Sequence, residues 1–264
     1  MALKGPLFRL LRAQLSHTCQ QSRAQSVAVL GAPFSRGQKR RGVEHGPKVI
    51  RDAGLIERLS GLDYSVHDFG DLNFHHLEKD EPYMNVKSPR TVGGANKIIA
   101  GAVSRAVGAG HTLVMLGGDH SHILKTLGIQ YFTMRDIDRL GIQRVMEVTL
   151  DHLLARKQRP IHLSYDIDAF DPSLAPATGT PVNGGLTYRE GIYITEEIHN
   201  TGLLSAMDLV EVNPVLGANR EAVEATASLA VNVIASSLGQ TREGAHVSID
   251  EIPPVKDDTE QLRL

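Results

Sequence analysis

The feature that most constrains the fold of this chain is the alternation of short apolar runs with longer stretches of helical periodicity. Several of the apolar runs end at Gly or Pro, which is typical of strands that are buried on both faces. The runs that predict strands lie at 26–33, 64–69, 112–116, 128–134, 160–165 and 204–212. The stretches that predict helices lie at 46–60, 91–110, 137–156, 188–200 and 220–238. Strands of this kind between helices predict an α/β fold, with a parallel sheet and helices on both of its faces.

The composition excludes several classes of protein. The chain has 264 residues, of which 41% are apolar, so it can bury a core in one large domain or two small ones. Its formal net charge of −2 gives no electrostatic reason to expect a nucleic-acid partner. Cys19 is the single cysteine, which excludes a disulfide framework and a cysteine-based zinc site. No apolar run approaches the ~18 residues that a membrane span needs, so we expect a soluble protein of a reducing compartment.

The first 43 residues contain basic side chains and no acidic one, and their leucines recur at helical spacing between Leu3 and Leu15. A basic, amphipathic leader without acidic residues is typical of a mitochondrial transit peptide. We therefore predict a transit peptide over residues 1–24, cleaved between Ser22 and Gln25, and a location in the mitochondrial matrix. The alternative is a basic tail that targets nothing. The remaining chain is predicted to form a single domain over 25–250, followed by a flexible tail over 251–264.

Polar side chains follow three of the predicted strands at the point where each strand ends. His120 comes shortly after the strand at 112–116, in a Gly-Gly-Asp-His turn. Asp166 and Asp168 follow the next predicted strand but one, and Glu211 lies at the end of the last. Because ligands bind at the carboxyl ends of the strands of such sheets, these side chains are predicted to share one edge.

The spacing of Asp166 and Asp168 favours a metal ion. On an extended backbone two residues apart, both carboxylates lie on the same side, and two like charges there are costly unless a cation lies between them. Carboxylate and imidazole ligands without thiolate favour Mn²⁺ or Mg²⁺ over structural zinc. An isolated Asp-x-Asp is more often a solvated turn, but His120 and Glu211 at neighbouring strand ends favour the metal site.

Together the motifs of this chain resemble those of the arginase family, from about residue 26 to 244. The motifs that carry the resemblance are Gly31-Ala-Pro-Phe-Ser35, Gly42-Val-Glu-His-Gly-Pro47, Leu116-Gly-Gly-Asp-His-Ser121, Ser164-Tyr-Asp-Ile-Asp-Ala-Phe-Asp-Pro172, Ala177-Thr-Gly-Thr-Pro181, Gly184-Gly-Leu-Thr-Tyr-Arg-Glu-Gly191, Glu211-Val-Asn-Pro214 and Thr241-Arg-Glu-Gly244. The basic leader is similar to that of mitochondrial members. The resemblance implies a three-layer α/β domain that holds two Mn²⁺ ions and hydrolyses L-arginine to L-ornithine and urea, a step of arginine catabolism and the urea cycle.

The resemblance also implies roles for particular residues. His120 would ligate one manganese ion, Asp166 would bridge both, and Asp168 would ligate the other. Glu211 would accept the guanidinium group of the substrate and Thr180 would line the same pocket, with the metal-bound hydroxide as nucleophile. The alternatives are that Glu211 pairs with a structural arginine and that Thr180 belongs to an ordinary loop.

The chain departs from the family pattern after Ser121, where arginases continue for roughly ninety residues that are absent here. The absent stretch would hold an Asp-Ala-His-x-Asp-Ile-Asn motif with further metal ligands, and most groups that bind the amino and carboxylate groups of arginine. We therefore expect a sheet that lacks central strands, a strand at 128–134 without its partners, and weak metal binding.

Three functions remain open from the sequence. The chain is a weakly active or inactive arginase, a non-catalytic isoform that interacts with full-length subunits, or an agmatinase-like amidinohydrolase. The resemblance implies a homo-oligomer, a trimer in the family, with Arg242 in the region of the subunit contacts.

Overall fold

The structure is a computed structural model that describes residues 26–37, 40–75, 77, 79–83, 88–118, 130–155 and 157–242. The predicted transit peptide, the C-terminal tail, His120 and the junction after Ser121 all lie outside the described residues. Among the described residues, no helix is both long and apolar enough to cross a membrane.

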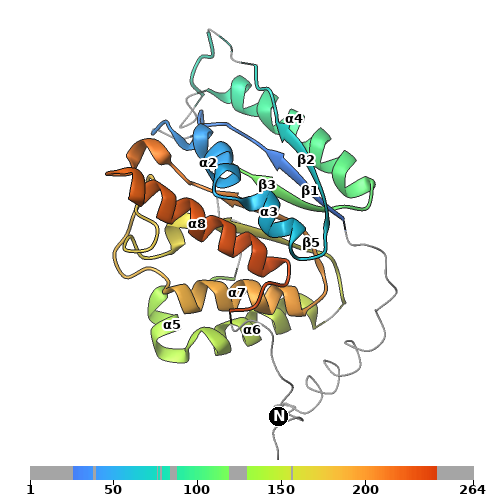
Figure 1. The fold of residues 1–264 in the computed structure, drawn as a ribbon, viewed down its shortest axis with the longest axis vertical. Coiled ribbons are helices and arrows are strands. Elements are labelled where there is room, and N and C mark those ends of the chain that lie inside the picture. Colours follow the sequence, from blue (N-terminus) through green and yellow to red (C-terminus); the bar gives the residue numbers. More distant parts are fainter. Residues whose placement is uncertain are drawn as a thin grey trace, which may run out of the picture.

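Five parallel strands form one continuous sheet in the order β2-β1-β3-β5-β4 (Figure 1). The strands are β1 (Ser26–Gly31), β2 (Ser65–Asp71), β3 (Thr112–Leu116), β4 (Ile161–Asp166) and β5 (Leu204–Val210). All five lie where strands were predicted, and the predicted parallel α/β fold is confirmed, although β2 is exposed at most of its positions and is not buried on both faces. β3, β5 and β4 are neighbours, so the strands that precede the three predicted clusters of site residues lie side by side.

The helices cover both faces of this sheet, as the alternation of the sequence predicted. They are α2 (Gly46–Asp52), α3 (Leu55–Ser60), α4 (Pro89–Gly108), α5 (Met134–Leu140), α6 (Ile142–Leu154), α7 (Tyr188–Asn200) and α8 (Arg220–Ser237), with short 3₁₀ turns η1 (Val43–His45), η3 (Ile167–Ala169) and η4 (Pro214–Leu216). α2, α3 and α8 lie together in front of the strands in Figure 1. Each is amphipathic and buries its apolar side against the sheet.

The two faces of the sheet carry alternate residues of each strand. Val29 and Leu209, both fully buried, belong to a large cluster that includes residues of α2, α3, α7 and α8. Leu30 and Leu113 point to the opposite face, where they pack with small alanines of α4. The core therefore lies mainly between the sheet and the layer of α2, α3, α7 and α8.

Two of the predicted helices are each divided into two. The helix predicted over 46–60 breaks at Gly54 with φ 87°, and the one predicted over 137–156 breaks at Gly141 with φ 75°. Both glycines lie in the left-handed region, which L side chains rarely adopt. Because both glycines adopt a conformation that ends a helix, each predicted helix is divided into two shorter helices.

The strand predicted at 128–134 is wrong in its described part. Residues 130–133 form no strand, and α5 begins at Met134. The Thr133 hydroxyl accepts a hydrogen bond from the Asp136 N–H, and the Asp136 carboxylate accepts one from the Thr133 N–H, which makes a capping box. Tyr131 is 69% exposed, so this apolar stretch is not a core strand. The Thr-x-x-Asp signal for a helix start outweighs the apolar pair beside it.

Candidate functional site at the carboxyl edge of the sheet

The carboxyl ends of β3, β5 and β4 meet at one edge. Leu209 of β5 is in register with Leu116 on one side and with Tyr165 on the other. Beyond this level, the Glu211 N–H donates to the Gly118 carbonyl at 3.0 Å. The structure therefore brings Gly118, Glu211 and Asp166 to neighbouring positions, which confirms that these strand ends share an edge. His120 follows Gly118 by two residues but is not among the described residues.

Gly118 lies where two backbone segments approach very closely. A Cβ atom at this position would be 1.8 Å from the carbonyl oxygen of Phe34, in the loop that follows β1. Any side chain would have to move that backbone, so only glycine fits here. The glycine at position 118 thus lets the chain that follows β3 pack directly against the backbone of the loop that follows β1.

Asp166 lies on an extended backbone but Asp168 does not, so the prediction that both carboxylates project from one extended segment is wrong. Asp166 ends β4, and the next three residues form the 3₁₀ turn η3. The Asp166 Oδ1 atom accepts a hydrogen bond of 3.2 Å from the Asp168 N–H. A short polar side chain at a strand end caps the following turn in this way, because it satisfies an N–H that the turn leaves open.

A loop that crosses the strand ends connects the two acidic clusters. Thr178 makes an antiparallel bridge with Val212, and its hydroxyl donates to the Glu211 carbonyl at 2.9 Å. Two residues further on, the Thr180 hydroxyl donates a short hydrogen bond to Asp168 Oδ2. The sequence assigned Thr180 to the pocket of Glu211, and the structure brings it into direct contact with Asp168.

Glu211 combines burial with a rare backbone conformation. The residue is 4% exposed, and its φ is 66°, in the left-handed region. For a non-glycine residue this conformation costs about 1–2 kcal/mol. Strain of this kind is found preferentially where a side chain must be aimed into a site. The geometry therefore favours a functional carboxylate at position 211.

A polar cluster that the sequence analysis missed lies on β4 and β5. Asp208, whose side chain is 8% exposed, has one carboxylate oxygen 2.6 Å from His162 Nε2 and accepts a 2.7 Å hydrogen bond from the Ser164 hydroxyl on the other. The hydrogen bond between His162 and Asp208 raises the pKa of His162 above its usual value. A charged residue inside an otherwise apolar strand was the available signal, since aspartate is rarely buried without partners.

Comparison with known proteins decides the family. The sequence model of the arginase family matches residues 25–127 and 121–239. This chain belongs to the arginase family. It is 48% identical to "Arginase, non-hepatic 1" of Xenopus laevis over 360 residues, with all of both chains covered. It is also 48% identical to human "Arginase-2, mitochondrial" over 339 residues, with 96% of each chain covered.

Solved structures give the same result for the fold. The arginase from Bacillus caldovelox superposes with a TM-score of 0.73 at 29% sequence identity, covering 83% of this chain and 99% of that one. The arginase from Bacillus subtilis gives 0.71 at 28% identity, over 83% and 100%. The predicted arginase-like architecture is therefore confirmed.

The comparisons also bear on the length of this arginase-family chain. Its 264 residues are aligned over 360 positions of the Xenopus protein, so a part of that alignment has no counterpart here. The two matches to the family model meet at residues 121–127, where the sequence analysis placed the absent stretch.

The metal ligands implied by the arginase family are only partly described. Asp166 and Asp168 are described, and no three His, Cys, Asp or Glu side chains of the described residues come together as a metal site. Asp168 is engaged by Thr180, and Asp166 caps η3. The described donors thus do not fit a centre of two manganese ions, because a pair of hard divalent cations needs more oxygen and nitrogen ligands than two carboxylates offer.

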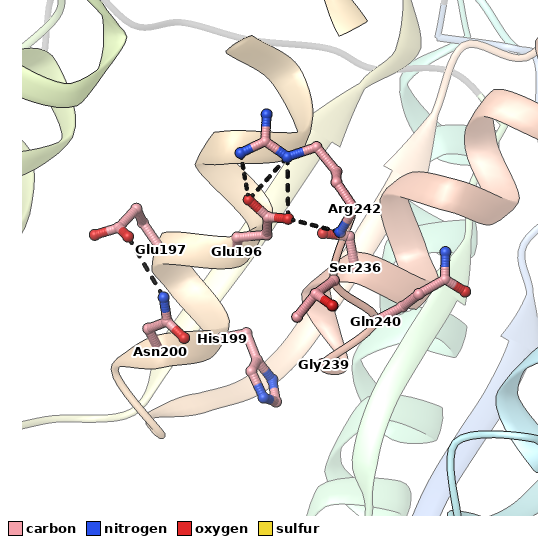
Figure 2. Close-up of a pocket in the computed structure, with 9 residues that line it drawn as sticks. Glu196, Glu197, His199, Asn200, Ser236, Gly239, Gln240 and Arg242 are labelled. Carbon is pink, nitrogen blue, oxygen red and sulfur yellow. Dashed lines mark hydrogen bonds and ion pairs between the residues drawn. The ribbon is translucent and has the colours of Figure 1, made fainter. Parts of the chain in front are cut away.

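Arg242, which the resemblance placed near subunit contacts, binds within its own chain. Its guanidinium group donates to both carboxylate oxygens of Glu196 on α7, at 3.1 Å from Nε and 2.7 Å from Nη2. Figure 2 shows this pair at one side of a pocket of about 270 Å³, with His199 and Gly239 across from it. Burial lowers the pKa of His199. A planar bidentate pair ties the chain after α8 to α7.

Proposed function

We propose that this chain derives from arginases that hydrolyse L-arginine to L-ornithine and urea, and that the chain itself catalyses this reaction weakly or not at all. The observation that carries the proposal is the absence of any Asp-x-His-x-Asp pattern from the full sequence. The family resemblance assigns three metal ligands to that pattern and three to His120, Asp166 and Asp168. A manganese pair held by half of its ligands would bind weakly.

The groups that remain are suited to recognise a guanidinium ion. Glu211 is a buried carboxylate at the sheet edge, and its backbone is fixed by Gly118 on one side and Thr178 on the other. A carboxylate held in this way can accept two parallel hydrogen bonds from a planar guanidinium, which sets the orientation of the substrate. Thr180 and Asp168 would form the neighbouring wall.

The direct test measures metal and turnover together. The full chain is purified, equilibrated with Mn²⁺ and freed of loosely bound metal, and bound manganese and urea release from L-arginine are measured. We expect less than one tightly held ion per chain and little urea. Two tightly held ions with substantial turnover would contradict the proposal. The same assay with agmatine separates the agmatinase-like alternative, which requires urea from agmatine in preference to arginine.

A variant separates substrate binding from metal binding. Glu211→Gln keeps the size of the side chain but removes its charge, so it is expected to weaken arginine binding without changing bound manganese. Asp168→Asn provides the matched control, because it is expected mainly to lower the amount of bound manganese. Equal effects of both variants on manganese would contradict the division of roles.

The location and the assembly of the chain belong to the same proposal. The acid-free leader and the identity to human "Arginase-2, mitochondrial" support the mitochondrial matrix, although the Xenopus relatives named non-hepatic are equally similar. Import of a fusion to a fluorescent protein tests the leader. Sedimentation of the chain alone and with an intact arginase subunit tests for a homo-oligomer and for the non-catalytic isoform, with Arg242→Ala as the variant that should weaken either contact.

A further inference from the structure

At the opposite end of the sheet, two histidines lie side by side. His67 belongs to β2, and His111 directly precedes β3; both strands flank β1. Their ring centres are 5.0 Å apart and their planes are inclined by 50°. Ser26 and Ala28 lie on β1 between the two flanking strands, and their small side chains leave room for the rings to meet.

Each ring is held through one of its two nitrogens. His111 Nδ1 is 2.8 Å from the Ser26 hydroxyl, and His67 Nε2 is 3.2 Å from the Ser65 hydroxyl. Among the described residues, no hydrogen bond engages the other nitrogens, His111 Nε2 and His67 Nδ1. A metal-bound imidazole characteristically donates its second N–H to an oxygen, which fixes the ring and its tautomer. The two serines provide such oxygens.

We infer that His67 and His111 form a binding site for a divalent transition-metal ion of the Zn²⁺ class. A zinc ion about 2.0–2.1 Å from one nitrogen of each ring, at a tetrahedral angle, places the ring centres roughly 5 Å apart, in agreement with the observed separation. His67 is exposed and His111 is half-buried, so an ion can enter from solvent and keep water molecules as its remaining ligands. Phe69, whose ring lies 6.2 Å from that of His111, adds an apolar wall.

This site is distinct from the carboxyl edge in position and in chemistry. It lies at the amino ends of the strands, and its donors are two imidazoles, which suit zinc, copper and nickel. The carboxylates Asp166 and Asp168 lie at the other end of the sheet and favour manganese or magnesium. Binding at the histidine pair therefore does not depend on arginase activity.

The test is a titration of the full chain with Zn²⁺, followed by calorimetry and by the NMR signals of the imidazole nitrogens. His67→Gln and His111→Gln are each expected to raise the Kd of one zinc site at least tenfold, and the double variant to add little to either. His152→Gln is the matched control, because His152 is an exposed histidine on α6 far from this pair in the sequence. Ser65→Ala is expected to weaken binding less than His67→Gln.

Circular dichroism of each variant shows whether the fold is kept. The same titration of Asp166→Asn distinguishes zinc bound at the carboxyl edge from zinc bound at the histidine pair. Unchanged zinc affinity and stoichiometry in a folded His67→Gln chain would overturn the inference and leave the two rings as an aromatic contact. The same holds if zinc shifts the imidazole signals of other histidines but not those of His67 and His111.

Discussion

The face of the sheet that carries Val29, Leu116 and Leu209 packs against α2, α3, α7 and α8, and all three residues are fully buried. On the opposite face, α4 packs over β1 and β3, and the side chains of β4 and β5 include His162 and Asp208. Apolar contact holds the first face together. The second face adds a charge-assisted pair, in which a nearly buried carboxylate is satisfied by two polar groups of the adjacent strand.

This difference shows how a parallel sheet can tolerate a buried charge. A carboxylate taken from water into a core is destabilising unless it is hydrogen-bonded, and an edge strand with alternating polar residues can supply the bonds. Asp208 therefore stabilises the pairing of β4 with β5 only because Ser164 stands opposite it and the side chain of His162, two residues earlier on β4, reaches it. Substitution should lower the free energy of unfolding most on the apolar face, less at Asp208 and least at His162.

The largest effect is expected for Leu209→Ala on the apolar face. Removing a fully buried leucine leaves a cavity, so the free energy of unfolding should fall by about 2–5 kcal/mol, measured by urea denaturation. Leu153→Ala on α6 makes the same chemical change at a residue that is 43% exposed, and should cost about 1 kcal/mol or less. Similar losses for both variants would show that the burial of Leu209 is not what stabilises the apolar face.

A smaller loss is expected for Asp208→Asn on the second face. The change keeps the shape of the side chain but removes its charge, so the bonds to His162 and Ser164 weaken and the free energy of unfolding should fall by about 1–3 kcal/mol. Asp151→Asn, at an exposed position of α6, is the control and should change it by less than about 0.5 kcal/mol. No difference between the two variants would show that the cluster is not stabilising.

The smallest effect is a pH dependence that originates at His162. Because Asp208 raises the pKa of His162 in the folded chain, this contribution is fully present below the unfolded-state value near 6.5 and is lost as the pH rises through the higher folded value. The stability difference between the natural chain and His162→Gln should therefore be larger at pH 6 than at pH 8.5. It should stay below about 1 kcal/mol, because the histidine side chain is 59% exposed. A difference that is constant or grows with pH would contradict this origin.

Much of the fold could be predicted from the sequence, because its signals are local. The strands at 112–116 and 204–210 are short apolar runs, and their burial on both faces follows from composition alone. The breaks at Gly54 and Gly141 could not be predicted in the same way, since a glycine inside an apolar pattern is compatible with a continuous helix. At Thr133 the sequence carries a local capping signal, Thr-x-x-Asp, next to a short apolar run that alone favours a strand.

The candidate site was predicted in position but not in detail. That Asp166 and Glu211 lie at one edge follows from the parallel topology. The contact of Thr180 with Asp168 depends on a loop whose path is set by Val212, and the partner of Asp208 depends on the register between β4 and β5. Such contacts join residues far apart in the sequence, so periodicity and spacing do not encode them. The predicted roles in metal and substrate binding stay predictions.

The left-handed backbone of Glu211 has a consequence for how this position can change. Glu211→Gly and Glu211→Ala both delete the carboxylate, but only glycine adopts a φ of 66° at no steric cost, so the glycine variant should be the more stable of the two by about 1 kcal/mol. Thermal melting of the pair measures this directly. Among residues without a carboxylate, a laboratory selection for heat resistance alone would accumulate glycine at codon 211. Under the proposed role of Glu211, a selection that also requires guanidinium recognition would restore the acid.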